Sequence, residues 1–454
     1  MSLGACRLKR RFLVLVLGLW ASLNLVSCGG SKSTGTRSGL VDRVLVSQGV
    51  SATSTFGRLV IVDGYNDTLT ATSPLSAGTS PRLMAVSPSR NIAMAFDPVS
   101  NTVYSVNTTK ETSIGQGVAL PGATFSMTVP TSSTVAYAAV PTANVPGFNF
   151  LGAVEVMNLS GSSISTTIAV TNAETVIANA NGSQLLVFSN DSDSVTVLTP
   201  GDALPGIDLS CSAPVNPAVC TVIPGFNRPV YAIINGTTAY VLNCGFECGG
   251  TQQASLQTLD LNSLAVGKPV LVNGATYAYL SGTKLYVAGR GTPTGPLCSA
   301  LTSSVNAKTA ATFCGTLDVV DMTTMTDPYY NSPGTEIAIP DGYHDRMDMS
   351  INGQLFVGSH GCTDIGDVNN PNGEVRGCLA ILNTNTGAVI IPPDNGDVNG
   401  LQSFTSREIE YVAEGGALRV YDTTKDKLLI NDFLPLGTIN VIGYVGDVKA
   451  IDFF

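Results

Sequence analysis

Hydrophobic residues along most of the chain occur in short runs that turn residues separate. In several runs apolar and polar residues alternate, and no segment keeps a helical apolar period over several turns. Short runs with a two-residue alternation are typical of β-strands, whereas helices need longer segments with a 3.6-residue period. The pattern therefore predicts an all-β fold.

The strand-like runs form a repeated unit of a first strand, a tight turn, a second strand, a variable loop and a third strand. Asn-Gly predicts a type I′ hairpin turn, which needs positive φ at both central residues. The clearest copies are Asn181-Gly182 before residues 184–187, Asn235-Gly236 before 239–242, Ser281-Gly282 before 285–288, and Asn352-Gly353 before 355–358; weaker second strands begin near residues 43, 91, 134 and 408.

A third strand follows each second strand, which gives eight units. The third strands are residues 59–63, 103–106, 154–157, 195–198, 256–260, 317–321, 379–382 and 418–422. A recurring unit of several strands is typical of a β-propeller. We therefore expect residues 40–454 to form a propeller with eight blades; seven blades and a two-sheet sandwich are the alternatives.

A propeller ring also needs a closing strand, because a closed ring removes exposed sheet edges. Residues 439–444 fit an innermost strand that completes the unit begun by residues 43–46. Residues 448–451 have no place in this scheme.

Two units carry a recognisable sequence pattern. Leu285-Tyr-Val-Ala with Leu317-Asp-Val-Val-Asp, and Tyr411-Val-Ala-Glu with Leu418-Arg-Val-Tyr-Asp, resemble the YVTN-type β-propeller repeat. The resemblance covers most of residues 42–435 and is weak in the first three units. It implies the fold rather than the function, since the repeat occurs in surface-layer proteins, lactonase-like enzymes and other exported proteins. The long cysteine-containing loops depart from the family pattern.

The N-terminal segment predicts export. Arg7 and the basic residues 9–11 precede an apolar stretch, 12–25, that is too short to span a bilayer comfortably, as in a secretory signal. Leu25-Val-Ser-Cys28 resembles a bacterial lipobox, which implies acylation of Cys28 and cleavage before it; the alternative is an ordinary signal with a chance cysteine. We expect residues 1–27 to be the signal and 28–39 a flexible, lipid-anchored tether. By analogy, Gly29 after the cysteine favours the outer membrane.

Removal of that signal, which holds four basic and no acidic residues, lowers the net charge from −10 to −14. A chain this acidic lacks the electrostatic footprint of a nucleic-acid-binding protein. Anionic lipid should also repel it, so the acyl anchor must supply the membrane contact. The signal contains the only tryptophan, Trp20.

Eight cysteines follow Cys28, and an even number in an exported protein predicts disulfides. Many connectivities are possible, and sequence order favours local pairs. A zinc site at Cys244 and Cys248 is the alternative, because their spacing suits that metal. The favoured pairs are Cys211–Cys220, Cys244–Cys248, Cys298–Cys314 and Cys362–Cys378.

The candidate site lies in the seventh unit, where the loops between second and third strands meet the links between blades. His344 before the first strand and His360 at the end of the second are the only histidines. With Asp345, Asp364 and Asp367 they predict either a catalytic centre or a site for calcium or another divalent metal, or else a hydrogen-bonded rim. The segment 394–400 has calcium-like spacing but does not match an EF-hand loop.

No phosphate-binding loop, nucleophile elbow or zinc-protease motif occurs in the sequence. We expect a non-enzymatic binding or scaffold module for a protein, peptide or glycan partner in the cell envelope, with no cofactor. The alternatives are a metal-dependent hydrolase or lactonase-like enzyme, and a structural surface protein.

Overall fold

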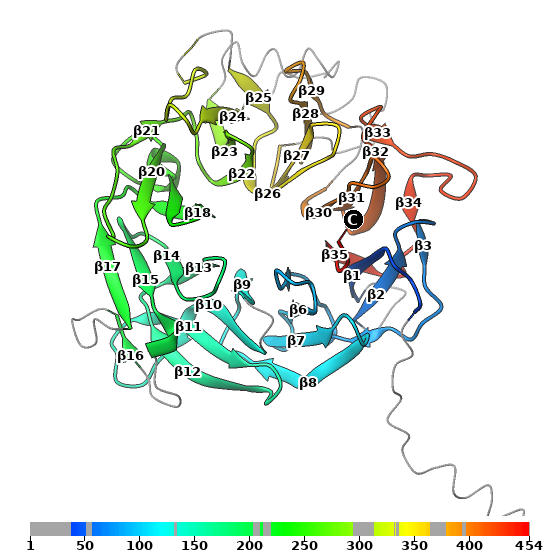
Figure 1. The fold of residues 1–454 in the computed structure, drawn as a ribbon, viewed down its shortest axis with the longest axis horizontal. Coiled ribbons are helices and arrows are strands. Elements are labelled where there is room, and N and C mark those ends of the chain that lie inside the picture. The colour runs from blue at the N-terminus through cyan, green and yellow to red at the C-terminus, as the bar shows by residue number, and fades with distance from the viewer. Residues whose placement is uncertain are drawn as a thin grey trace, which may run out of the picture.

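Eight β-sheets are arranged around a common axis, so the chain forms an eight-bladed β-propeller (Figure 1). The eight predicted blades are therefore confirmed over seven blades or a sandwich. The structure, a computed structural model, describes residues 38–50, 57–130, 134–202, 209–211, 219–293, 313–330, 332, 336–363, 378–392 and 396–453.

The first four blades run from the N-terminal strand to the middle of the chain, and their strands are given from the axis outward. Blade 1 contains β35 (Tyr444–Ala450), β1 (Arg43–Gly49), β2 (Arg58–Asp63), β3 (Thr68–Leu69) and β4 (Leu75–Ser76). Blade 2 contains β5 (Met84–Val86), β6 (Ile92–Asp97), β7 (Thr102–Asn107) and β8 (Thr112–Ala119). Blade 3 contains β9 (Ser126–Thr128), β10 (Val135–Asn144), β11 (Leu151–Asn158), β12 (Ser163–Ala169) and β16 (Leu209–Ser210). Blade 4 contains β13 (Ala173–Ala178), β14 (Leu185–Ser189), β15 (Ser194–Leu198) and β17 (Cys220–Pro224).

The other four blades complete the ring. Blade 5 contains β18 (Pro229–Asn235), β19 (Thr238–Asn243), β20 (Ser255–Asp260) and β21 (Val270–Leu271). Blade 6 contains β22 (Tyr277–Ser281), β23 (Lys284–Pro293), β24 (Phe313–Asp321) and β25 (Ile337–Ile339). Blade 7 contains β26 (Tyr343–Met349), β27 (Gln354–His360), β28 (Leu379–Asn383) and β29 (Val389–Ile390). Blade 8 contains β30 (Val398–Phe404), β31 (Ile409–Glu414), β32 (Ala417–Asp422), β33 (Lys427–Leu428) and β34 (Thr438–Ile439). Within the described residues, the short 3₁₀ helices η2 (Pro200–Asp202) and η3 (Gly245–Cys248) lie in loops.

The ring closes where β35 pairs with β1, so the two ends of the described chain share blade 1. Closure by a C-terminal innermost strand was predicted, but of residues 439–444 only Tyr444 belongs to that strand. Ile439 lies in β34, which pairs with β32 at the outer side of blade 8. The closing strand includes residues 448–450 of the stretch that the sequence left without a place.

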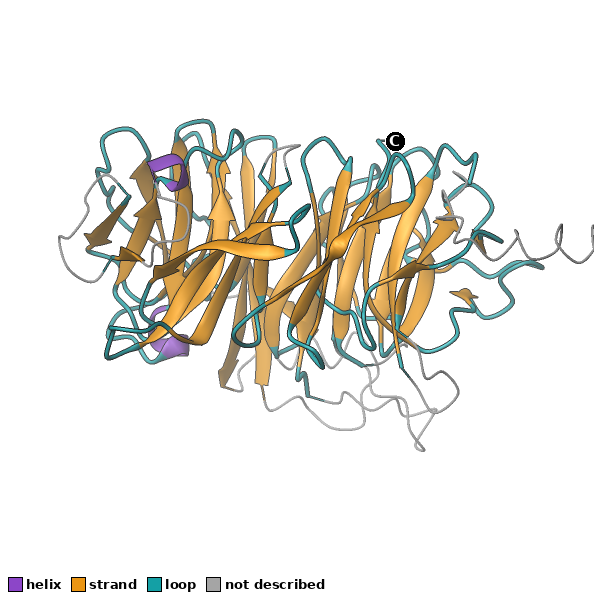
Figure 2. Cartoon of the chain, turned by 90° about the horizontal axis from the view of Figure 1, so that it is seen from below, coloured by secondary structure: helices purple, strands orange, loops and turns teal. Residues whose placement is uncertain are grey.

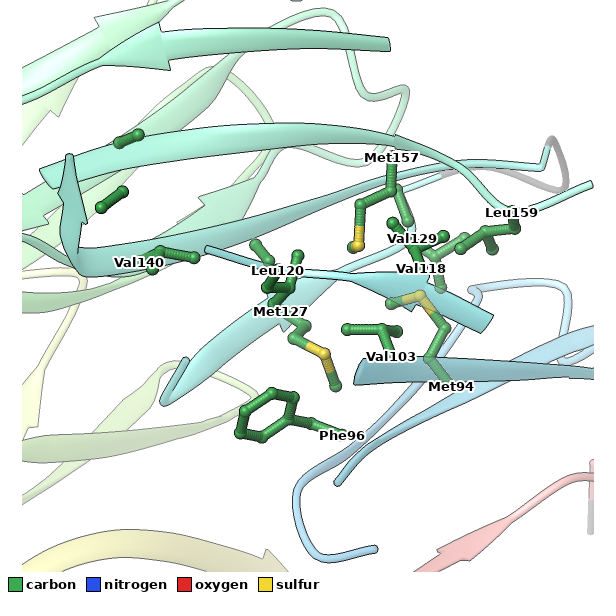
Figure 3. Packing of buried hydrophobic residues seen from close by; sticks show 14 of the residues in the cluster. Met94, Phe96, Val103, Val118, Leu120, Met127, Val129, Val140, Met157 and Leu159 are labelled. Carbon is green, nitrogen blue, oxygen red and sulfur yellow. The ribbon is translucent and has the colours of Figure 1, made fainter. Parts of the chain in front are cut away.

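Neighbouring blades bury apolar side chains against each other. On β1, Val44 and Val46 face blade 8, whereas Leu45 between them faces blade 2. Both faces of a middle strand are therefore covered, which explains why the second and third strands appear in the sequence as continuous apolar runs. Each of the eight interfaces between blades holds one such cluster, and Figure 3 shows the cluster between blades 2 and 3.

The glycine turns connect first to second strands as predicted, but they are not type I′. Gly236 and Gly282 have φ of 61° and 59°, while their partners Asn235 and Ser281 are not among the residues with positive φ. Asn235 pairs with Thr238 across a two-residue loop, and positive φ at the first loop position alone is typical of a type II′ turn. Glycine takes that position because it adopts positive φ without a steric penalty.

The strand order gives the ring two different faces, seen edge-on in Figure 2. We call the face with the second-to-third-strand loops and the links between blades face A. Face B carries the turns between first and second strands and between third and fourth strands. The second-to-third-strand loops of blades 5–7, where the sequence predicts a site, therefore belong to face A.

Candidate functional site on face A

Disulfides lie in the face A loops of blades 5 and 7. Cys244 bonds Cys248 within the loop between β19 and β20, and Cys362 bonds Cys378 between β27 and β28. Cys211 bonds Cys220 beside β17, near the face B end of that strand. These three predicted pairs are confirmed, and the predicted zinc alternative at Cys244 is wrong.

Cys314 is also disulfide-bonded, while Cys298 lies outside the described residues. Disulfides persist in oxidising compartments, so these bonds indicate an extracellular or similarly oxidising location. In the part of the chain that the structure describes, no helix is both long and apolar enough to cross a membrane.

A β-bulge shapes the face A end of blade 7. His344 of β26 is opposite Ser359 of β27, but the next paired residues are Arg346 and Gly358. Asp345 is therefore the extra residue of the bulge. Such bulges commonly redirect a side chain beside a functional site.

The bulge brings Asp345 between two cationic side chains. Its Oδ1 lies 3.1 Å from Nε2 of His360, and its Oδ2 accepts a hydrogen bond of 3.0 Å from Nη1 of Arg346. On the other side of the imidazole, Oδ2 of Asp397 lies 3.9 Å from Nδ1 of His360. The four side chains keep exposed fractions of 23–50%. We call Asp345, Arg346, His360 and Asp397 the blade 7 cluster.

The cluster stabilises its own charges. Burial disfavours the charged form of His360, but the contact with Asp345 outweighs it and raises the pKa of His360 above 6.5. Burial also opposes ionisation of Asp345, yet Arg346 and His360 hold the pKa of this carboxyl below its usual value. The cluster therefore presents two carboxylates, a guanidinium and an imidazole whose protonated form Asp345 favours, all at partly exposed positions, which suits a polar ligand.

His344 lies at the same end of the blade but in different surroundings. Its side chain is buried, and Nε2 lies 3.0 Å from the backbone oxygen of Pro340. The ring packs against Gly315 of blade 6, where an added Cβ would come within 2.7 Å of Cε1. Burial lowers the pKa of His344 to about 4. His344 therefore acts as a neutral packing group between blades 6 and 7.

The two histidines should titrate far apart, and the chain has no others. In NMR spectra of their ring C–H groups, we expect His344 to stay neutral between pH 8 and about 5, because its pKa is about 4. His360 should titrate above 6.5, and Asp345→Asn should lower its pKa. Lys425→Ala, at a pair on face B, is the control. A His360 pKa unchanged by Asp345→Asn would contradict the charge pairing.

The metal site stays a prediction. No group of three or more His, Cys, Asp or Glu side chains is arranged for a metal among the described residues. Asp364, Asp367 and Cys28 lie outside them. The structure brings Asp345 and His360 together, whereas the ring of His344 points into the interface between blades.

Two residues on face A had only weak signals in the sequence. Asp397 belongs to the calcium-like segment 394–400, and its Oδ1 accepts a hydrogen bond from the backbone N–H of Gly361. Glu247, inside the Cys244–Cys248 loop, accepts a hydrogen bond of 3.1 Å from the backbone N–H of Arg290. Burial raises the pKa of Glu247 to about 7. These contacts connect blades 7 and 8, and blades 5 and 6, on face A.

Comparisons with known proteins support the fold alone. No protein-family model and no curated protein matches the chain. The chain is similar to the computationally designed Ika8 protein, with a TM-score of 0.51 and 8% identity over 86% of this chain and 97% of that one. It is also similar to the dihydro-heme d1 dehydrogenase NirN in complex with DHE, with a TM-score of 0.54 and 11% identity over 94% of this chain and 78% of that one.

Proposed function

We propose that this chain is an exported lipoprotein, anchored through Cys28, whose propeller binds a protein, peptide or glycan partner on face A of blades 5–7. The main observation behind this proposal is the blade 7 cluster, which lies on the same face as the disulfide-bonded loops of blades 5 and 7. Loops held on a rigid scaffold are common binding surfaces.

The cluster favours a polar partner. Asp345 and His360 have side chains about one-quarter to one-third exposed, so a ligand can reach them without a change of fold. Tyr343 of β26 lies two residues before Asp345 and pairs with His360 of β27; it is 39% exposed, which adds an aromatic surface beside the charges. A tyrosine next to paired charges offers both hydrogen bonds and apolar contact.

Two further observations support the proposed cellular location and the proposed family. The disulfides agree with export, and the sequence around Cys28 resembles a lipobox. The segments that resemble the YVTN-type repeat occupy equivalent positions: 285–288 and 317–321 are in the second and third strands of blade 6, and 411–414 and 418–422 are in those of blade 8. We therefore propose a YVTN-type propeller lipoprotein.

Site-specific photo-crosslinking in intact cells tests the binding surface. A photoreactive residue at Tyr343 or at Phe246, which is 62% exposed in η3, should yield the same adduct. The same residue at Leu271, 42% exposed on the outer strand β21, should not. Asp345→Asn should reduce the adduct from Phe246 about tenfold, because a hydrogen bond to a charged group contributes about 1.5 kcal/mol or more.

Equal labelling from Leu271, or no adduct from either face A position, would refute face A as the binding surface. Loss of the adduct in Asp345→Asn is informative only if the variant folds. Its far-UV circular dichroism and melting temperature should therefore match those of the unsubstituted protein.

A further inference from the structure

Three apolar side chains on face B of blade 1 are strongly exposed. Val41 is 76% exposed, and Tyr65 and Phe453 are each 68% exposed. We call these three residues the exit patch. Val41 precedes β1, Tyr65 lies in the turn between β2 and β3, and Phe453 follows β35, so all three are at the face B end of the blade.

Hydrogen bonds hold the three segments of the exit patch together. The backbone N–H of Gly64 donates to the oxygen of Asp42 over 2.7 Å, which brings Tyr65 next to Val41. The backbone N–H of Arg43 donates to Oδ2 of Asp452 over 2.8 Å, which brings Phe453 to the same place. The patch is thus built from the beginning, the first turn and the end of the described chain.

The described chain begins beside this patch. Oγ of Ser38, the first described residue, donates to Glu111 over 2.6 Å. Glu111 lies in the turn between β7 and β8, on face B, and also pairs with Arg43. Ser38 is therefore held on face B, and the blade 7 cluster is on the opposite face.

The distance to the proposed anchor is short. The ten residues 28–37 precede Ser38 and begin with Cys28. Even a fully extended chain spans at most about 35 Å over that number of residues. An acyl chain on Cys28 therefore keeps face B of blade 1 within that distance of the lipid.

We propose that the exit patch contacts the lipid surface itself, so that the propeller lies with face B toward the membrane and face A away from it. This inference rests on the proposed lipid anchor. The net charge of −14 after removal of residues 1–27 opposes electrostatic adhesion to anionic lipid. Apolar side chains beside the anchor add buried apolar area to the attachment that the acyl chains on Cys28 provide, and they fix which face of the propeller lies against the lipid.

Single-tryptophan reporters test the orientation, because Trp20 is the only tryptophan and lies in the predicted signal. Acylated Tyr65→Trp, Phe453→Trp and Phe246→Trp proteins are reconstituted separately into phosphatidylcholine vesicles that contain brominated lipid. The emission of the two face B reporters should be quenched and should shift to shorter wavelength. The face A reporter replaces Phe246, which is 62% exposed, and its emission should change in neither respect.

Mass spectrometry of the N-terminal peptide separates this inference from the proposed anchor. Acylated protein without quenching at either face B position refutes membrane contact by the exit patch and leaves the anchor intact. Quenching of the Phe246→Trp reporter refutes the orientation and the use of face A for a partner. An unacylated Cys28 refutes the anchor, and the exit patch then stands only if unacylated protein added to the vesicles is still quenched.

A matched pair of substitutions measures the contribution of the patch. Val41→Ser should weaken partitioning of the acylated protein into vesicles by up to about tenfold, as expected for the loss of one buried aliphatic side chain. Val99→Ser is the control, since Val99 is 69% exposed in a face A turn of blade 2. Equal partitioning of both variants would refute the contribution of Val41.

Discussion

Replacement of Arg43 by alanine should lower the free energy of unfolding by about 3–5 kcal/mol. The guanidinium is 3% exposed and pairs with Glu111 of blade 2 and with Asp452 after β35. Its Nη1 also donates to the backbone oxygen of Thr108. The hydrogen bond with Asp452 contributes most to raising the pKa of Arg43.

The expected loss of stability is large because the substitution would leave a buried carboxylate without its cationic partner. Glu111 is 3% exposed and would lose a buried partner, and removal of one member of a buried ion pair leaves an uncompensated charge. The Arg43 side chain also connects blade 2, through Glu111, to Asp452, which follows the closing strand β35. Urea unfolding followed by circular dichroism at neutral pH measures the change.

Lys425→Ala is the matched control for Arg43→Ala. Lys425 pairs with Asp422 over 2.7 Å, but its side chain is 61% exposed. An exposed pair contributes about 1 kcal/mol or less. If the two variants lost similar stability, the closure of the ring would not depend on the buried charges around Arg43.

The sequence predicts the middle strands of the blades better than the strand that closes the ring. A middle strand such as β14 is covered on both sides, so burial selects an uninterrupted apolar run, Leu185 to Phe188. The closing strand β35 contains Asp447 and Lys449, whose side chains pair over 2.9 Å. Asp447 also accepts a hydrogen bond from the backbone N–H of Met84. Tertiary contacts compensate these charges, but they are not visible in the sequence. A prediction from hydrophobicity alone therefore favours the more apolar residues 439–444.

The candidate site is predicted only in part for a similar reason. His344 and His360 flank a predicted hairpin, which places both at one end of blade 7, and the register confirms this position. The bulge that exposes Asp345 depends on pairing between two strands and has no marker in the sequence. The approach of Asp397 to His360 joins the beginning of blade 8 to the end of β27, a contact that no local spacing encodes.

The second large effect concerns pH and a buried carboxyl pair in blade 6. Asp318 of β24 is fully buried, and its carboxyl accepts hydrogen bonds of 2.8 Å and 2.6 Å from the backbone N–H and Nδ2 of Asn273. Burial is the main cause of a strongly raised pKa, and the nearby carboxyl of Asp327 raises it further. The hydrogen bonds from Asn273 oppose these effects without cancelling them.

A raised carboxyl pKa makes the folded state bind more protons than the unfolded state at pH values above about 4. The contribution of Asp318 to the free energy of unfolding should therefore decrease as the pH rises from about 5 to 8, whereas the lowered pKa of His344 acts in the opposite direction below about pH 6.5. If the folded state binds one proton more than the unfolded state, the free energy of unfolding changes by up to about 1.4 kcal/mol per pH unit. Glu410, which is also fully buried and has a raised pKa, adds to the same trend.

Asp318→Asn should reduce this slope, because an amide imitates the protonated acid in shape and carries no charge at any pH. Urea unfolding at several pH values between 5 and 8 measures the difference from the unsubstituted protein. Asp321→Asn is the control, since Asp321 is the partly exposed last residue of β24 and its pKa is lowered chiefly by hydrogen bonds from Thr323. Its effect should be confined to pH values below that range. If Asp318→Asn kept the full slope while Asp321→Asn changed it, the buried pair of blade 6 would not be the source of the pH dependence.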